Sequence, residues 1–159
     1  MIPNKGGPAD FCEAVISGEN DVLYSDMSNI ANTVPLISVI DDDASIRAGL
    51  DNLVRSLGYV VRTFQSAEAF LLSAELHEAW CVIADVRMSA MSGVQLQSHL
   101  RRQGCQLPFL FITAVPTEKT RRQALDDGAI CFLTKPFDEE TLIGCLDVAI
   151  GQHRSSSIS

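Results

Sequence analysis

The feature that most constrains the fold is an alternation, between residues 35 and 150, of five short apolar runs with five stretches of helical periodicity. Such an alternation is typical of a doubly wound α/β fold, in which helices connect the strands of a parallel sheet and cover both of its faces. The apolar runs predict strands near residues 36–40, 59–64, 81–85, 108–113 and 130–134. We therefore expect one domain with a five-stranded parallel sheet and five crossover helices.

The five helical stretches differ in how much apolar surface they can bury. Residues 44–57 carry a clear apolar stripe, and a helix starting at Asp138 aligns Leu142, Leu146, Ala149 and Ile150. Two further amphipathic helices are expected to begin near Ser66, with Phe70, Leu71 and Leu76 on the apolar side, and near Ser92 or Gly93. The remaining helix, from Thr117 to Asp127, has only Ala124 and Leu125 as substantial apolar residues, so we expect it to be the least firmly anchored.

The ends of the chain do not share this pattern. A length of 159 residues suits one ordinary domain with tails. Residues 1–34 lack sustained apolar periodicity and are predicted to be a poorly ordered extension, with Met27 as an alternative natural start. The polar segment 151–159 is too short for a domain and is predicted to be a disordered tail.

Composition limits the partners and the location. Twenty acidic residues against twelve basic ones give a formal charge of -8, which disfavours direct binding to nucleic acid or to anionic membranes. The apolar runs are far shorter than the about 20 residues that span a bilayer, and the start does not resemble a signal peptide. The five cysteines show no CxxC spacing, which argues against a disulfide framework and against a zinc site. We expect a soluble cytoplasmic protein.

Acidic residues follow two of the predicted strands. Asp41, Asp42 and Asp43 come directly after the first strand, and Asp85 ends the third. Ligands of open parallel sheets bind at the carboxyl ends of strands, where the winding order reverses, so these carboxylates converge if the two strands are neighbours. Two carboxylates about 4 Å apart repel by about 4 kcal/mol at an effective dielectric constant of about 20, so the group needs a cation or raised pKa values. Oxygen ligands suit Mg²⁺, with Mn²⁺ as an alternative.

One aspartate has an ordinary structural explanation, since Asp43 precedes a helix and can cap it. Two other polar residues end the fourth and fifth strands, Thr113 and Lys135. Taken singly, they could be a capping hydroxyl and a solvated lysine. Together with the aspartates they supply a carboxylate nucleophile, metal ligands, a hydroxyl donor and an ammonium, which are the groups that phosphoryl transfer to aspartate requires.

The segments that carry these residues are VIDDDASIRAGL, VIADVRMSAMSG, LFITA and AICFLTKPFDEETL. In this order and spacing, over residues 36–150, they resemble the motifs of bacterial response-regulator receiver domains, which have the CheY-like, or flavodoxin-like, fold. The SAEAFL segment and the VRM stretch are similar to the FixJ type. The resemblance implies the sheet order 2-1-3-4-5.

The resemblance also implies a role for each acidic residue. Asp85 would be the phosphoacceptor, and Asp42 would coordinate Mg²⁺ together with Asp85 and the main-chain carbonyl of Arg87. Asp41 would contribute through a water molecule. The family usually has proline after the methionine of this loop, whereas Ser89 follows Met88 here, so a rigid element is missing and metal affinity is expected to suffer.

The remaining roles concern the phosphoryl group and its effect. Thr113 would bind a phosphoryl oxygen, Lys135 would pair with that group, and Ala114 would leave room for attacking water. Phe132 would swing inward on activation, and the Lys135–Pro136 peptide bond would be cis. A second departure, Pro116 in the loop after Thr113, restricts the segment that family members reshape and is expected to damp the switch.

The resulting hypothesis is a stand-alone receiver, not an enzyme beyond its own phosphotransfer and dephosphorylation. Its partners would be a sensor histidine kinase or a histidine phosphotransferase, and a homodimer or target protein bound at the face of the fourth helix, fifth strand and fifth helix. One alternative is a receiver fragment of a longer FixJ-type transcription regulator. Another is an interaction module that no longer uses phosphate.

A remote alternative is a haloacid-dehalogenase-like phosphatase, because Asp41 and Asp43 form a DxD pattern and Lys135 follows downstream. That class needs an acidic pair at a strand end after the lysine, whereas Asp138, Glu139 and Glu140 open a predicted helix. It also leaves Asp85 without a role.

Overall fold

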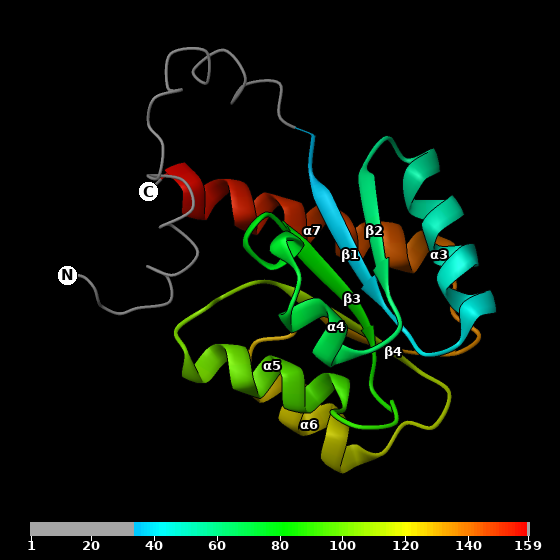
Figure 1. Cartoon of the computed structure of the whole chain (residues 1–159). Coiled ribbons are helices and arrows are strands. Elements are labelled where there is room, and N and C mark those ends of the chain that lie inside the picture. Colours follow the sequence, from blue (N-terminus) through cyan, green and yellow to red (C-terminus); the bar gives the residue numbers. More distant parts are fainter. Residues whose placement is uncertain (1–33, 159) are drawn as a thin grey trace.

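A computed structural model of the chain describes residues 34–158 (Figure 1). The expectation of a poorly ordered extension over residues 1–34 therefore concerns residues that, apart from Val34, lie outside the described range. The same holds for the proposed start at Met27.

The core is a single parallel sheet whose strands were expected from the apolar runs. The strands pair in the order β2-β1-β3-β4-β5, and every neighbouring pair is parallel, so the fold class and strand order are confirmed. They are β1 (Leu36–Ile40), β2 (Val60–Phe64), β3 (Cys81–Asp85), β4 (Phe109–Thr113) and β5 (Cys131–Thr134).

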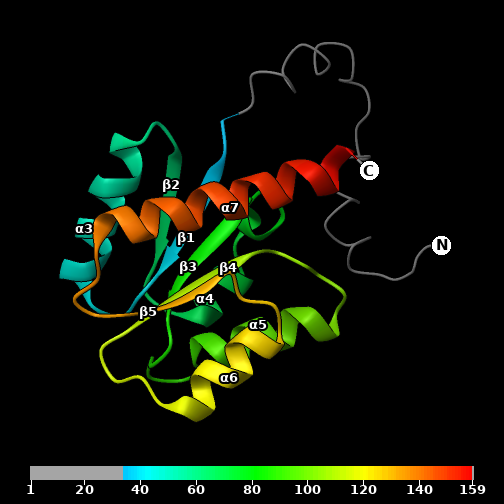
Figure 2. The same ribbon diagram turned by 180° about the vertical axis from the view of Figure 1, so that it is seen from behind.

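Helices cover both faces of this sheet, as Figures 1 and 2 show from opposite sides. The helices α3 (Ala44–Ser56) and α7 (Glu139–Ile158) pack on one face over a core that includes Leu50, Val54, Leu142 and Leu146. On the other face are α4 (Ala67–Leu71), α5 (Gly93–Arg102) and α6 (Glu118–Asp126). Burial of apolar area on both faces, at about 25 cal/mol per Å², is the main force that holds the layers together.

Two expectations about helices are wrong. The second crossover is not one continuous helix, because α4 ends at Leu71 and a 3-10 helix, η2 (Ala74–His77), carries the buried Leu76. The hydroxyl of Ser73 donates to the carbonyl of Phe70 at 2.8 Å, and such local side-chain bonds compete with helix continuation.

The predicted disordered tail is also contradicted, because α7 continues through residues 151–158. The extra turns pack against the start of β3. The His153 ring stacks on Trp80 with centroids 4.3 Å apart, and the Arg154 guanidinium lies 5.3 Å from the same Trp80 ring. These contacts stabilise a polar segment whose composition alone does not favour a helix.

The helix α6 is anchored weakly, as expected, and mainly at one end. Ala124 is its buried residue, while Leu125 is 37% exposed. The carboxyl end of α6 accepts hydrogen bonds from α5: Gln97 Nε2 donates to the carbonyls of Ala124 and Asp127, and Arg101 Nε donates to the Asp127 carbonyl at 2.8 Å. The amino end of α6 therefore has less to hold it than the carboxyl end.

Four of the five cysteines lie in the part of the chain that the structure covers. Cys81, Cys105, Cys131 and Cys145 are free, and Cys12 lies outside the described range. Between residues 34 and 158, no helix is both long enough and apolar enough to cross a membrane.

Candidate functional site

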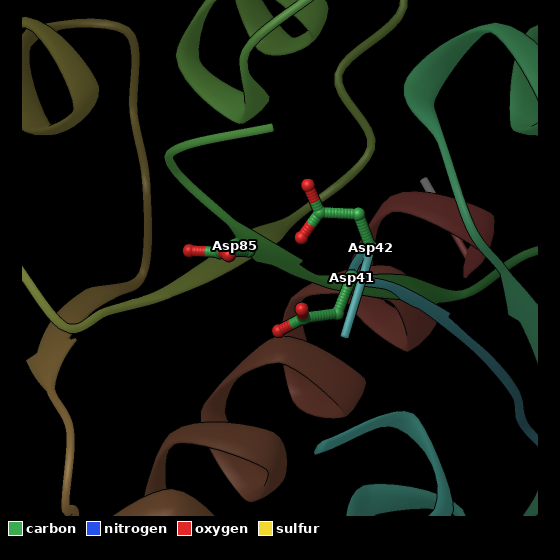
Figure 3. Close-up of side chains that lie close together, drawn as sticks. All are labelled: Asp41, Asp42 and Asp85. Atoms are coloured by element: carbon green, nitrogen blue, oxygen red, sulfur yellow. The ribbon is translucent and has the colours of Figure 1, made fainter. Parts of the chain in front are cut away.

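The acidic residues meet at the carboxyl edge of the sheet. Ile40 of β1 is paired with Ala84 of β3, so the residues that follow them, Asp41 and Asp85, lie at the same level on neighbouring strands. Figure 3 shows Asp41 and Asp42 at the end of β1, with Asp85 beside them. One carboxylate oxygen from each of the three aspartates lies within 4.8 Å of the other two. The convergence expected from sequence is thus present.

Burial makes this group of carboxylates costly. Asp41 is only 1% exposed and Asp85 is 8% exposed, whereas Asp42 faces solvent. Burial raises the pKa of Asp85 above its ordinary value, and the neighbouring charge of Asp41 raises it further. Lys135 and the backbone N–H of Arg87 oppose that rise in pKa by favouring the ionised carboxylate.

Lys135 places an ammonium among these carboxylates. Its Nζ lies 3.2 Å from Asp41 Oδ2 and 3.7 Å from Asp85 Oδ2. The backbone N–H of Lys135 donates to the carbonyl of Thr113 at 2.8 Å, which extends the β4–β5 pairing to the residue that carries the ammonium. The Lys135–Pro136 peptide bond is cis, as the resemblance implied.

Asp41 is held in place from three directions. Its Oδ1 accepts from the N–H of Asp43 at 2.9 Å, and its own N–H donates to the carbonyl of Phe64 at 3.1 Å. Arg47 donates to the Asp41 carbonyl at 2.6 Å. Asp43 turns away from the cluster and accepts from the N–H groups of Ser45 and Ile46, which confirms its expected role as the N-cap of α3.

Thr113 and Phe132 lie where the site meets α6 and β5. The Thr113 side chain is fully buried, and its Oγ1 accepts from the N–H of Val115 at 3.2 Å in the loop that leads to α6. Phe132 is partly buried against the core, with its ring centroid 6.4 Å from that of Phe111. Ala114, next to Thr113, is exposed. A change at Thr113 can therefore be passed to the α6 loop directly.

The loop between Asp85 and α5 closes the other side of the site. The Arg87 N–H donates to Asp85 Oδ1 at 3.4 Å. Gly93, the first residue of α5, lies so close to β3 that a Cβ there would be 2.3 Å from the Asp85 carbonyl oxygen. Glycine is required at this contact because any side chain would displace the backbone of Asp85.

The donor set fits a hard divalent cation. Three carboxylates and one ammonium leave the cluster with two negative charges in excess when all are ionised, and all three acids offer oxygen. Mg²⁺ is bound by one or two carboxylates plus water and phosphate oxygens, which this partly buried, solvent-facing group can provide. Mn²⁺ accepts the same oxygen ligands.

Sequence reasoning missed one contact beside the site and one at the opposite edge of the sheet. Glu68 of α4 accepts from the N–H of Met91 in the loop after Asp85, and Gln97 with Arg101 holds the end of α6. Glu68 follows a helix N-cap, where an acidic residue is ordinary, so its pattern gave no signal of a distant partner.

These observations define a receiver domain: a parallel five-stranded sheet of this order with an acidic cluster, a threonine and a lysine at its carboxyl edge. The family profile "Response regulator receiver domain" matches residues 37–147, and the chain belongs to this family. Receiver domains are signalling domains of two-component systems, which work with histidine kinases and typically use Mg²⁺ at an acidic pocket.

Particular relatives agree with this assignment. The chain is 36% identical over 124 residues to the response regulator protein TodT of Pseudomonas putida, covering 78% of this chain and 55% of TodT. It is 36% identical over 116 residues to the transcriptional regulatory protein FixJ of Bradyrhizobium diazoefficiens, covering 73% of this chain and 57% of FixJ. The solved structure of chemotaxis protein CheY4 from Vibrio cholerae superposes with a TM-score of 0.66 at 27% identity, covering 74% of this chain and 99% of CheY4. The matched part of the chain thus spans about half the length of TodT and of FixJ.

The phosphatase alternative finds no support in this geometry. Glu139 and Glu140 lie in the first turn of α7 and form no acidic pair at a strand end. Asp85, which that alternative leaves without a role, is one of the three clustered carboxylates.

Proposed function

We propose that this receiver accepts a phosphoryl group onto Asp85 from a sensor histidine kinase or a histidine phosphotransferase in the cytoplasm. The observation that carries the proposal is the meeting of Asp41, Asp42 and Asp85 with Lys135 at one edge of the sheet. A buried carboxylate with an ammonium beside it is a competent nucleophile, and the neighbouring acids can hold the cation that a phosphoryl oxygen needs.

In the proposed reaction, an Asp85 oxygen attacks the phosphorus of the phosphohistidine. The new O–P bond forms as the histidine N–P bond breaks, which leaves an aspartyl phosphate and releases the histidine of the donor. Asp42, Asp85 and the Arg87 carbonyl are the proposed ligands of Mg²⁺, with Asp41 acting through water. Bound there, the metal would neutralise charge on the phosphoryl oxygens. Lys135 would turn from Asp41 toward the phosphoryl group, and exposed Ala114 would leave access for the water that later hydrolyses it.

The signal would leave the site through Thr113. Its Oγ1 now accepts from the N–H of Val115. On phosphorylation the hydroxyl would turn to donate to a phosphoryl oxygen, which would pull on the loop before α6 and open space for Phe132. The population would then shift toward an arrangement with an altered α6–β5–α7 face, the surface proposed to bind a second copy or a target protein. Pro116 in the moving loop would make this shift smaller.

A second proposal concerns the whole protein. FixJ is named a transcriptional regulatory protein, and the matched segment covers 57% of it. The receiver would in that case control a transcription-regulating partner or segment rather than act alone as a shuttle, relay or phosphate sink. The interaction module without phosphate is the remaining outcome if Asp85 proves inert.

The decisive experiment is intact-mass measurement after treatment with acetyl phosphate and Mg²⁺. The wild-type protein should gain one phosphoryl group, and Asp85→Asn should gain none because the nucleophile is gone. Asp51→Asn is a matched control, because Asp51 is a surface acid of α3 paired with Arg55 and away from the cluster. An adduct of equal yield on the Asp85→Asn protein would overturn the assignment.

A further inference from the structure

The loop that links β3 to α5, residues 86–92, depends on one distant hydrogen bond. Its other hydrogen bonds are local: Arg87 N–H donates to Asp85, Ser92 N–H donates to Gln95, and Gly93 N–H donates to the Val86 carbonyl. The N–H of Met91, in contrast, donates to Glu68 Oε2 at 3.1 Å across 23 positions of sequence. Between residues 34 and 158, this is the single hydrogen bond recorded from the loop to another part of the fold.

Glu68 is a firm support for this loop. It lies in the first turn of α4, whose neighbours Ala67 and Phe70 are fully buried, and Ser66 caps the helix through the N–H of Ala69 at 3.0 Å. An ionised carboxylate accepting from a backbone N–H forms a stronger hydrogen bond than a neutral acceptor does. The position of the Met91 peptide is therefore set by a helix that is itself fixed in the core.

Val86 anchors the start of the loop in the core, and the contacts of the residues after it constrain the loop less. Met88 and Met91 pack only partly buried against the core, and unbranched methionine side chains adapt to several backbone positions. Ser89 is exposed and makes no recorded hydrogen bond, so it does not restrict the loop as a proline would. Between the buried Val86 and the start of α5 at Gly93, the hydrogen bond that Met91 donates to Glu68 is thus the contact that ties the loop carrying Arg87 to a distant segment.

We propose that Glu68 is a positioning residue for the metal site. By holding the Met91 N–H, it would limit the motion of the loop that carries Arg87, whose own N–H donates to Asp85, and would replace the rigidity that Ser89 does not supply. Partners that orient metal ligands reduce the ordering cost of binding, because the ligand is already in place when the ion arrives. This inference rests on the proposed function, since the Arg87 carbonyl acts as a ligand only if the site takes Mg²⁺.

The test compares Glu68→Ala with Glu68→Gln by titration calorimetry with Mg²⁺. Alanine removes the acceptor, whereas glutamine keeps an acceptor oxygen and removes only the charge. We expect Glu68→Ala to weaken Mg²⁺ binding about tenfold, at the low end for outer partners of metal ligands, and Glu68→Gln to stay within about twofold of wild type. Glu75→Ala is the control, because Glu75 is an acid of the same crossover that pairs with Arg62. It should leave the affinity unchanged.

A second measurement separates this inference from the proposed function. Amide hydrogen exchange without metal should be faster over residues 86–92 in Glu68→Ala than in wild type, with β3 unchanged in both. Equal weakening of Mg²⁺ binding by alanine and glutamine would assign the effect to charge and overturn the positioning role. Unchanged exchange in the loop of Glu68→Ala would also overturn it. Failure of the wild-type protein to bind Mg²⁺ would contradict the proposed function, whereas the exchange comparison would still show whether Glu68 holds the loop.

Discussion

The ammonium of Lys135 lies closer to Asp41 than to the proposed phosphoacceptor, with Nζ at 3.2 Å from Asp41 Oδ2 and at 3.7 Å from Asp85 Oδ2. In the structure described here, Lys135 therefore compensates two buried carboxylates at once. Any cation or phosphoryl group that enters the site competes with this lysine for the same oxygens. The stability of the domain and its ligand binding are consequently coupled through Lys135.

Replacement of Lys135 by methionine should destabilise the metal-free protein. The side chain keeps its length but leaves the carboxylates without their ammonium, and loss of one partner of a buried pair costs several kcal/mol. Because Lys135 is 17% exposed on its side chain, we expect a loss of about 2 kcal/mol in the free energy of unfolding, partly restored by Mg²⁺. Urea unfolding with and without Mg²⁺ measures both effects. Lys119→Met, at an exposed position of α6, is the control. An equal loss of unfolding free energy in this variant would refute the coupling between stability and ligand binding through Lys135.

Addition of Mg²⁺ should raise the melting temperature of the wild-type protein, because the ion binds only the folded cluster. At 100 times the dissociation constant the stabilisation is about 2.7 kcal/mol. Asp42→Ala should erase most of this rise and should increase the stability of the metal-free protein by removing one crowded charge. Thermal unfolding in Mg²⁺ and in chelator measures both. An undiminished rise in the variant would exclude Asp42 as a ligand.

Gly93→Ala should destabilise the domain and displace the backbone of β3 at Asp85. The added Cβ would lie 2.3 Å from the Asp85 carbonyl oxygen and 3.0 Å from the Phe111 ring, so we expect a loss of about 3 kcal/mol and slower phosphorylation. Gly144→Ala is the matched control, because a Cβ there meets nothing within 4 Å inside α7. It should stabilise the protein by about 0.5–1 kcal/mol. Similar stabilities for the two variants would contradict the crowding at Gly93.

Acidification should weaken the domain through His153. Burial, and then the charge of Arg154, lower the pKa of His153 in the folded state below its ordinary value. The unfolded chain therefore takes up this proton first, so stability falls as pH decreases from about 7 through the unfolded pKa near 6.5 and levels off below the folded pKa. His153→Phe keeps a ring against Trp80 and should flatten this dependence. Urea unfolding of both proteins between pH 7.5 and about 5 measures how the free energy of unfolding depends on pH. An identical dependence in wild type and His153→Phe would assign it to other groups.

Occupancy of Asp85 by a phosphate mimic such as beryllofluoride should change amide exchange over residues 114–137. We expect the change to be largest at the amino end of α6 and small at its carboxyl end, which Gln97 and Arg101 hold from α5. Pro116→Gly should enlarge the change by freeing the loop. Unaltered protection with the mimic bound would contradict the switch and favour a phosphate sink.

Much of the site could be predicted because its residues follow strands. The positions of Asp41, Asp85, Thr113 and Lys135 at strand ends are a property of local sequence, and parallel pairing brings such ends to one edge. The positions of strand ends do not show which atoms pair. Lys135 is nearer to Asp41 than to Asp85, and Thr113 accepts from the N–H of Val115. Both contacts depend on side-chain rotamers that the packed surroundings select.

The sequence by itself determined the sheet, the starts of the main helices, the acidic cluster and the family, because apolar periodicity and capping residues act over a few neighbouring positions. Only the tertiary structure decided the contacts between distant segments. Glu68 reaches Met91 across 23 positions, and Gln97 and Arg101 hold the end of α6. Trp80 contacts His153 and Arg154 in a helical segment for which composition favoured disorder. These contacts form only after the core has placed their elements side by side, and no local pattern encodes such a placement.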